Sequence, residues 1–151
     1  AQHRHKRLLI AVDLKTTGAA ADVVRLAKRH RVLSRLLFIG KPIADPAMRA
    51  RIKKASPAAQ TAALANRAEE YDQALNAPNA DWVYVRFLPN KAQVEAAKRR
   101  KKHIFIAGAT VSGRRVRNWQ QADRVGIDAI LTDFPLDLQS QLRLQAGSRG
   151  P

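Results

Sequence analysis

The sequence predicts an α/β fold built on a parallel sheet, and three observations support this prediction. Short apolar runs alternate with longer amphipathic stretches along the 151 residues, which is the pattern of βα units. Residues 126–135 (GIDAILTDFP) combine a helix-ending glycine, an apolar run too short for a helix, and an acidic turn closed by a proline. No linker divides the chain, so we expect one domain at residues 8–145, between a basic N-terminal tail (1–7) and a C-terminal tail (146–151).

The composition limits the functions that the chain can have. The sequence contains no cysteine, which excludes disulfides, thiolate zinc sites and cysteine nucleophiles. No stretch approaches the roughly 20 apolar residues of a membrane-spanning helix, and residues 1–7 lack the apolar core of a signal peptide. These features predict a soluble chain and leave its compartment open, whether cytoplasmic or exported after signal removal.

The chain is strongly basic, with 28 Lys and Arg against 12 Asp and Glu and a formal net charge of +16. This excess favours anionic partners, namely phosphate esters, nucleic acid or an acidic membrane surface. The cations are spread along the chain, so solvation of the outer helices is the simpler interpretation. The densest run, residues 98–102 (KRRKK), ends a predicted helix, where the helix dipole favours cations. An aromatic content of 5% is low for a base-stacking surface.

The first βα unit begins at residues 8–14 (LLIAVDL), an apolar run of strand length. Gly18 breaks this run, and residues 19–31 have the periodicity of an amphipathic helix. A second strand at residues 36–39 is closed by Gly40. The helix residues that we expect to face inward are Val23, Val24, Leu26 and Ala27.

The next elements are marked by capping residues and prolines. Asp45 is a suitable N-cap for a helix at residues 46–55, which has a proline in its first turn. Residues 60–64 (QTAAL) predict a weak strand, because alanine is a poor strand former. Asn66 is expected to cap a helix at residues 67–75.

The second half of the chain predicts three more strands, each followed by a helix. Residues 82–86 (WVYVR) are rich in the aromatic and β-branched residues that strands favour. Asn90 opens the helix that follows them, and Gly108 and Gly126 end the next strand and helix. The expected strands are 82–86, 103–107 and 129–132, and the expected helices are 91–100, 114–125 and 136–144.

Strict alternation of about six strands and six helices predicts a parallel sheet with right-handed crossovers. The units recur at roughly 20 to 28 residues, which is within the range of barrel units. Six strands form either an open doubly wound sheet or six-eighths of a barrel, and the pattern leaves both open. The sequence contains neither glycine-rich nucleotide-binding motif and no Gly-x-Ser-x-Gly nucleophile motif.

Polar side chains at strand ends are the candidate functional residues. Asp13 and Lys15 lie two apart at the end of the first strand, so alternation places both on one face. A carboxylate there can bind Mg²⁺ or Ca²⁺, and an ammonium can neutralise a phosphate oxygen, although a plain salt bridge is the simpler interpretation. Thr132 and Asp133 end the last strand, where Asp133 either contacts a ligand or, more simply, caps the next helix.

The histidines and large aromatic residues have structural interpretations. His3 and His5 lie in the basic tail, where a metal pair is conceivable and a disordered tail is the simpler interpretation. His30 is expected on a helix surface, and His103 begins a strand at the end away from the ligand-binding rim. The aromatic residues for which core packing is the preferred interpretation are Trp82, Tyr84 and Trp119.

The order of these segments resembles the glycerophosphodiester phosphodiesterase family. Residues 126–135 resemble its closing strand, in which Gly-hydrophobic-Asp precedes an apolar pair and Thr-Asp-x-Pro. Residues 10–15 (IAVDLK) resemble the family's acidic-x-Lys strand, and residues 104–111 resemble the strand that leads to its Trp-Thr-Val stretch. The three segments occur in the family's order, and the resemblance spans about residues 8–142.

The resemblance implies a (β/α)₈ barrel that holds Mg²⁺ or Ca²⁺ at its C-terminal mouth and cleaves glycerophosphodiesters to glycerol 3-phosphate and an alcohol. By this resemblance Asp13 occupies a metal-binding acidic position, normally Glu, and Lys15 occupies the lysine position beside it, toward the substrate phosphate. Thr132 and Asp133 match the closing motif at the rim. The sequence departs from the pattern at Ala109, where the family usually has Trp.

Four family motifs have no counterpart ahead of residues 10–15, where the family's first two βα units would place them: His-Arg-Gly, Pro-Glu-Asn-Thr, Glu-x-Asp and His-Asp. We therefore expect strands three to eight of the barrel, that is, an incomplete TIM-type (β/α) barrel of about six βα units that lacks the first two. Without the family's histidines, and with Asp13 as its one metal ligand, the chain is expected to retain no metal and to have little or no hydrolytic activity alone. Open strand edges predict self-association, a curled sheet sealed by the tails, or marginal stability. The alternative function is that of a non-catalytic basic α/β module that binds anions or nucleic acid.

Overall fold

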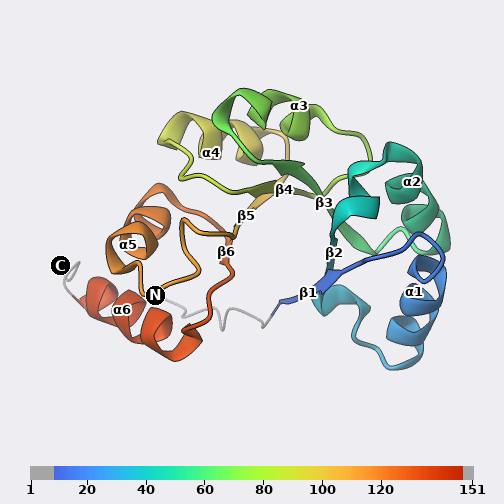
Figure 1. Cartoon of the computed structure of the whole chain (residues 1–151), viewed down its shortest axis with the longest axis horizontal. Helices are drawn as coiled ribbons and strands as arrows, with labels where there is room; N and C mark the ends of the chain where they lie inside the picture. Colours follow the sequence, from blue (N-terminus) through green and yellow to red (C-terminus); the bar gives the residue numbers. More distant parts are fainter. Residues whose placement is uncertain (1–8, 148–151) are drawn as a thin grey trace. The chain divides into compact units, whose positions relative to one another are not determined.

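The computed structural model describes residues 9–147, which divide into two compact units (Figure 1). Unit 1 comprises residues 9–63 and 77–81, and unit 2 comprises residues 64–76 and 82–147. The whole predicted N-terminal tail, with His3 and His5, and most of the predicted C-terminal tail lie outside the described residues. Within residues 9–147, no helix has the length and apolar character needed to cross a membrane.

The strands follow one another in the sheet in sequence order, β1-β2-β3-β4-β5-β6. Strands β1, β2 and β3 pair in parallel, as do β4, β5 and β6. A strand order that never reverses is that of a βα barrel, since a doubly wound sheet reverses its order at a switch point. The predicted fold class, an incomplete TIM-type barrel of six βα units, is therefore confirmed.

In unit 1, helices α1 and α2 lie side by side against strands β1 and β2 (Figure 1). All four residues of β2 are buried, as its apolar sequence predicts for a strand covered on both faces. The elements of unit 1 are β1 (Ile10–Asp13), α1 (Ala20–Arg29), the 3₁₀ turn η1 (Leu33–Arg35), β2 (Leu36–Ile39), the 3₁₀ turn η2 (Lys41–Ala44), α2 (Pro46–Ala55) and the first part of β3 (Gln60–Ala65).

Unit 2 contains the remaining βα units, and its helices α5 and α6 lie against each other. The register pairs Tyr84 with Phe105 and Val85 with Ile106, so each pair of neighbours lies on the same face of the sheet. The elements of unit 2 are the 3₁₀ turn η3 (Ala68–Glu70), α3 (Tyr71–Asn76), β4 (Trp82–Val85), α4 (Lys91–Arg99), β5 (His103–Ile106), α5 (Val116–Val125), β6 (Ala129–Ile130) and α6 (Pro135–Gly147).

The core of unit 1 forms where the inward face of α1 meets strand β2 and helix α2. Val24 and Ala27 are buried as predicted, but Leu26 is 54% exposed, so its predicted inward orientation is wrong. The buried positions of α1 recur at intervals of four and three residues, and Leu26 lies on the opposite side of that stripe. The core comprises Leu14, Ala20, Val24, Ala27, Leu33, Leu36, Phe38, Ile43, Met48, Ile52 and Ala59.

Two buried aromatic side chains in unit 2 satisfy their polar atoms within the unit. The Trp119 side chain is fully buried, as predicted, and its indole N–H donates to the Val111 carbonyl at 2.9 Å. The Tyr71 hydroxyl donates to the Gln93 carbonyl at 2.6 Å. Burial, and secondarily the neighbouring Asp72 carboxylate, raises the pKa of Tyr71 to about 12, so the hydroxyl remains a donor at neutral pH.

The predicted helix signals are largely confirmed. The Asp45 side chain accepts the Ala47 N–H at 2.8 Å, and Asn90 forms a capping box with Gln93. Gly126 ends α5 in the left-handed conformation, at φ 87°. The prediction for Asn66 is wrong, because its backbone N–H donates to the Glu70 carboxylate at 2.7 Å and the α-helix begins only at residue 71.

Asp128 joins the amino ends of strands β5 and β6. Its backbone N–H donates to the Ile104 carbonyl at 3.1 Å, and its carboxylate accepts the Ile104 N–H at 2.8 Å. The same carboxylate lies 3.3 Å from Nδ1 of His103, whose ring packs on Trp82 with centroids 4.7 Å apart. His103 therefore has the structural position predicted for it, away from the carboxyl ends of the strands.

Asp81 makes the corresponding connection in unit 1. Its N–H donates to the Thr61 carbonyl at 2.9 Å, and its carboxylate accepts the Thr61 N–H at 2.9 Å and lies 2.7 Å from Nζ of Lys53. Each aspartate follows a residue with positive φ and one buried apolar residue; here these are Asn79, at φ 57°, and Ala80. The two turns therefore share a local repeat: a positive-φ residue, a buried apolar residue, then Asp.

Replacement of Asp128 is predicted to destabilise unit 2. The Asp128→Ala change leaves the Ile104 N–H without its carboxylate acceptor, so the free energy of unfolding falls by about 1–3 kcal/mol. Trp82 and Trp119 both lie in unit 2, so tryptophan fluorescence in a urea titration measures the loss. The control, Glu95→Ala, removes a solvent-exposed ion pair in unit 2 and changes stability by at most about 0.5 kcal/mol. Equal losses in the two variants would contradict this role for Asp128.

Candidate functional site

The carboxyl end of β1 carries the predicted pair of charged residues in unit 1. Asp13 and Lys15 form an ion pair between the carboxylate and the ammonium, as their spacing predicts. Their side chains remain 47% and 80% exposed, so the pair stays accessible to a ligand in solution. Exposed pairs of this kind contribute little to stability.

Gly40 allows strand β2 to end directly beside this pair. It has φ 109°, a conformation that residues with a Cβ rarely adopt. A Cβ at this position would overlap the Leu14 carbonyl oxygen and would lie 2.5 Å from Oδ1 of Asp13. The Leu14 N–H donates to the Ile39 carbonyl at 2.9 Å, which fixes the two strand ends together. The position of the Asp13 carboxylate therefore depends on the glycine of the neighbouring strand.

The residues present do not fit a resident divalent metal ion. Mg²⁺ and Ca²⁺ take about six to eight oxygen ligands, usually including more than one carboxylate. The part of the chain that the structure describes contains no group of three or more His, Asp or Glu side chains that could hold a metal. Asp13 offers a single carboxylate, and that carboxylate is paired with the ammonium of Lys15.

The end of the last strand carries the other predicted pair, in unit 2. The Thr132 hydroxyl accepts the Phe134 N–H at 3.2 Å, and the Asp133 N–H donates to the Ser112 carbonyl at 3.3 Å. Among the described residues no hydrogen bond joins the Asp133 side chain to the first turn of α6, so the capping interpretation is wrong. Thr132 takes the capping-like role instead, and the Asp133 carboxylate stays exposed.

The loop between β5 and α5 connects the strand ends of unit 2. The Thr110 hydroxyl donates to the Arg86 carbonyl at 2.7 Å, and the Asn118 amide donates to the Thr110 carbonyl at 2.7 Å. Together with the hydrogen bond between Asp133 and Ser112, these contacts join the ends of β4 and β6 to one loop.

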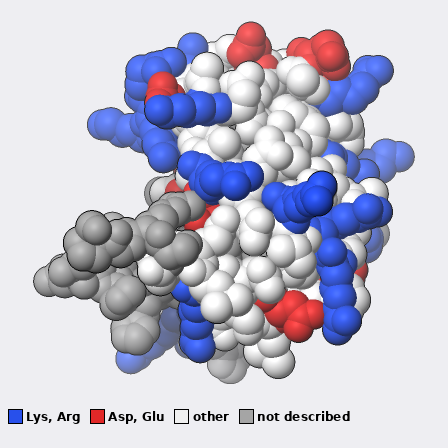
Figure 2. Space-filling view, turned by 90° about the vertical axis from the view of Figure 1, so that its left-hand side faces the viewer, with Lys and Arg blue, Asp and Glu red and all other residues white. Residues whose placement is uncertain are grey.

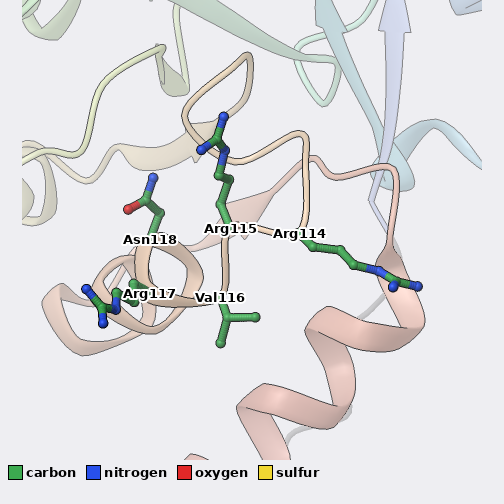
Figure 3. Close-up of a pocket in the computed structure, with 5 residues that line it drawn as sticks. All are labelled: Arg114, Arg115, Val116, Arg117 and Asn118. Atoms are coloured by element: carbon green, nitrogen blue, oxygen red, sulfur yellow. The ribbon is translucent and has the colours of Figure 1, made fainter.

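A cavity of about 330 Å³ opens at the start of α5 (Figure 3). Arg114 points toward α6, where its guanidinium lies 2.8 Å from the Asp137 carboxylate and over the Phe134 ring. Arg115 and Arg117 point away from Arg114 and from each other (Figure 3). The cavity is lined by Arg114, Arg115, Val116, Arg117 and Asn118. The three guanidinium groups do not converge on one point.

Among the charged side chains on the visible face of the space-filling view, Lys and Arg are more prominent than Asp and Glu (Figure 2). This appearance agrees with the formal net charge of +16. The basic stretch at residues 114–117 is visible in the sequence, but its place beside the rim of unit 2 depends on the fold.

Comparisons with known proteins connect this fold to one group of enzymes. No protein-family model and no curated protein sequence matches the chain. The structure is similar to that of a glycerophosphodiester phosphodiesterase from Agrobacterium tumefaciens, with a TM-score of 0.69 and 15% identity over 90% of this chain and 56% of that one. It is also similar to a glycerophosphodiester phosphodiesterase from Parabacteroides distasonis, with a TM-score of 0.66 and 16% identity over 93% of this chain and 58% of that one.

These similarities agree with the resemblance seen in the sequence. The chain spans 50–58% of the length of the five structures compared, all of them described as phosphodiesterases of this kind. Identities of 13–17% establish likeness of fold. The chain therefore has the fold of glycerophosphodiester phosphodiesterases, over about half of their length.

Proposed function

We propose that this chain forms part of a barrel whose activity is the metal-dependent hydrolysis of glycerophosphodiesters to glycerol 3-phosphate and an alcohol. The observation that carries the proposal is the likeness to phosphodiesterase structures over 90% or more of the chain, with strands in barrel order. The Asp13–Lys15 pair lies at the carboxyl end of a strand, where parallel βα folds bind their ligands.

Lys15 is the residue of unit 1 that we assign to the substrate phosphate. Its ammonium is a mobile point charge that can exchange the Asp13 carboxylate for a phosphate oxygen. The exchange costs little, because both groups of the exposed pair are already solvated. Asp13 then lies beside the bound phosphate and limits the affinity by repulsion between like charges.

Hydrolysis requires more than these two residues. The reaction needs a group that activates water and positive charge that stabilises the phosphoryl transition state. The described residues offer one carboxylate at the unit 1 rim and no cluster of metal-binding side chains. We therefore propose that the 151-residue chain by itself binds phosphate esters and does not hydrolyse them.

The first experiment separates binding from hydrolysis. With a glycerophosphodiester and Mg²⁺ or Ca²⁺, the purified chain is expected to release no glycerol 3-phosphate above a protein-free control. By calorimetry the chain binds glycerol 3-phosphate weakly, and Lys15→Gln weakens this binding at least threefold. The control Lys28→Gln removes an exposed ammonium from the last turn of α1 and leaves the affinity unchanged. EDTA-sensitive release by the purified chain, or equal binding by Lys15→Gln, would overturn the proposal.

We also propose that the chain associates with itself through strand edges. Among the described residues β1 pairs only with β2, which leaves the other edge of β1 without a strand partner. Ile10 on this strand is 41% exposed. An open edge with an exposed apolar residue is a template for pairing with another chain.

Sedimentation velocity at increasing protein concentration tests the association. The natural chain is expected to form larger species as concentration rises, and Ile10→Lys, which adds a charge at the edge, suppresses them. Leu26→Lys is the matched control, because Leu26 is an exposed apolar residue of unit 1 on the outer side of α1. A single monomeric species at all concentrations, or equal suppression by both variants, would be incompatible with edge pairing.

One observation favours a second candidate function, binding of nucleic acid. Lys98, Arg99, Arg100 and Lys101 are all exposed at the end of α4. No carboxylate among the described residues lies within ion-pair distance of these four side chains. Such an uncompensated cluster fits the phosphate backbone of a duplex, with binding that is independent of sequence.

The salt dependence of binding to duplex DNA tests this candidate. If all four cations contact phosphates, changing them together to Gln lowers the slope of log K against log salt by about 3–4, since each phosphate contact contributes about 0.9. A control variant loses the same charge elsewhere in unit 2, with Gln at Lys91, Arg115, Arg117 and Arg143, and keeps more of the natural slope. Equal losses of slope would show that only net charge matters and would eliminate the cluster as a site.

A further inference from the structure

Arg86 extends strand β4 at its carboxyl end, on the side of the sheet that carries aromatic side chains. Strand alternation places it on the same face as Trp82 and Tyr84, opposite the buried Val83 and Val85. The Tyr84 ring packs against Phe105 of the neighbouring strand, with centroids 5.1 Å apart. Arg86 thus lies at the rim, directly after an aromatic surface.

The guanidinium of Arg86 is oriented by Tyr84. Its Nε–H donates to the Tyr84 hydroxyl at 3.4 Å, and its central carbon lies 5.8 Å from the centroid of the same ring. The hydrogen bond to Tyr84 engages only Nε of Arg86. The two terminal nitrogens, Nη1 and Nη2, therefore remain available to donate to a ligand together. This is the edge of arginine that matches phosphate oxygens in a bidentate pair.

Contacts with strand β3 and with the loop between β5 and α5 hold Arg86 in place. Its N–H donates to the Ala65 carbonyl at 3.2 Å, and its carbonyl accepts the Thr110 hydroxyl at 2.7 Å. The aliphatic stem lies against Gly108, where an added Cβ would be 3.5 Å from Cγ of Arg86. The side chain of Arg86 therefore extends from a backbone that is held in place. Because it is already partly ordered, less conformational entropy is lost when a ligand binds.

The charge of Arg86 is not neutralised within the described part of the chain. Arg25, Arg67 and Arg114 each lie within 3.3 Å of a carboxylate. No carboxylate of residues 9–147 lies within ion-pair distance of Arg86. An oriented cation without an internal counterion, at the ligand-binding end of a parallel sheet, fits an external anion.

We propose that Arg86, oriented by Tyr84, forms an anion-binding subsite at the rim of unit 2 that holds the phosphate group of a phosphate ester through Nη1 and Nη2. The subsite belongs to unit 2 alone and requires no hydrolysis. The proposal depends on the proposed function in one respect, namely that we expect the anion to be a phosphate ester rather than another oxyanion. The nearby arginine cavity at the start of α5 is a weaker candidate, because its guanidinium groups point apart and Arg114 is paired with Asp137.

The experiment titrates the 151-residue chain with inorganic phosphate and with glycerol 3-phosphate. Nuclear magnetic resonance follows the side-chain N–H signals of the arginines, and the signal of Arg86 is expected to shift most. Arg86→Gln weakens phosphate binding at least tenfold, and Arg86→Lys weakens it several-fold because an ammonium cannot make the bidentate pair. Tyr84→Phe keeps the ring and removes the hydroxyl, so it has a smaller effect of about two- to fivefold. A phosphomonoester that carries a longer alcohol is expected to bind with the same dependence on Arg86.

Matched controls separate the subsite from general positive charge. Arg115→Gln and Arg117→Gln each remove one exposed guanidinium of unit 2, and each changes the affinity by less than twofold. Unchanged thermal transitions confirm that the variants fold. An Arg86 side-chain signal that does not shift when phosphate is added, or phosphate binding that falls as much in Arg117→Gln as in Arg86→Gln, would overturn the subsite.

The outcomes also separate this subsite from the proposed function. If phosphate binding depends on Arg86 while glycerol 3-phosphate binding is independent of Lys15, the subsite stands and the assignment of Lys15 fails. If Lys15→Gln weakens glycerol 3-phosphate binding while Arg86→Gln leaves phosphate binding intact, the subsite fails and the proposed function stands.

Discussion

The backbone hydrogen bonds between neighbouring parallel strands are the constraint on which the rest of the structure depends. The strands are short, with four residues in β1 and two in β6, so each ladder leaves N–H and C=O groups unpaired at its ends. Buried groups of this kind cost free energy unless other parts of the chain satisfy them. At the amino ends of β5 and β6, Asp128 satisfies both the N–H and the carbonyl of Ile104. At the carboxyl end of the β1–β2 ladder, the Leu14 N–H adds a hydrogen bond to the Ile39 carbonyl.

The two ends of the strands use polar side chains in different ways. At the amino ends, the Asp81 and Asp128 carboxylates accept backbone N–H groups and also lie beside Lys53 and His103 respectively, so these two side chains hold the strands together. At the carboxyl ends, Lys15 and Arg86 are oriented by a single neighbour and keep donors available. The proposed ligand-binding groups and the stabilising aspartates therefore lie at opposite ends of the strands, and the carboxyl ends are where parallel βα folds bind their ligands.

Much of the fold is predictable from the sequence because its signals are local. Periodicity, the capping box at Asn90 and the glycine at 126 each act within a few residues. The errors have two different causes. Leu26 is apolar but lies off the buried stripe of α1, so its hydrophobicity alone is misleading. The Asn66 backbone N–H is bound by the Glu70 carboxylate, and the α-helix begins only at residue 71. The Asp13–Lys15 pair follows from spacing along one strand, whereas the role that we propose for Arg86 depends on three segments, β3, β4 and the β5–α5 loop, that only the folded chain brings together.

The Asp13–Lys15 pair also supports our proposal that the rim of unit 1 binds an anion rather than a metal ion. A divalent cation at Asp13 would meet the ammonium of Lys15 at close range, and no second carboxylate among the described residues is grouped there to offset that repulsion. A phosphate is attracted instead of repelled, because it pairs with the ammonium of Lys15. The exposed Asp13 carboxylate is then solvated by water. Metal-dependent chemistry at this strand end therefore requires carboxylates in addition to those that residues 9–147 place there.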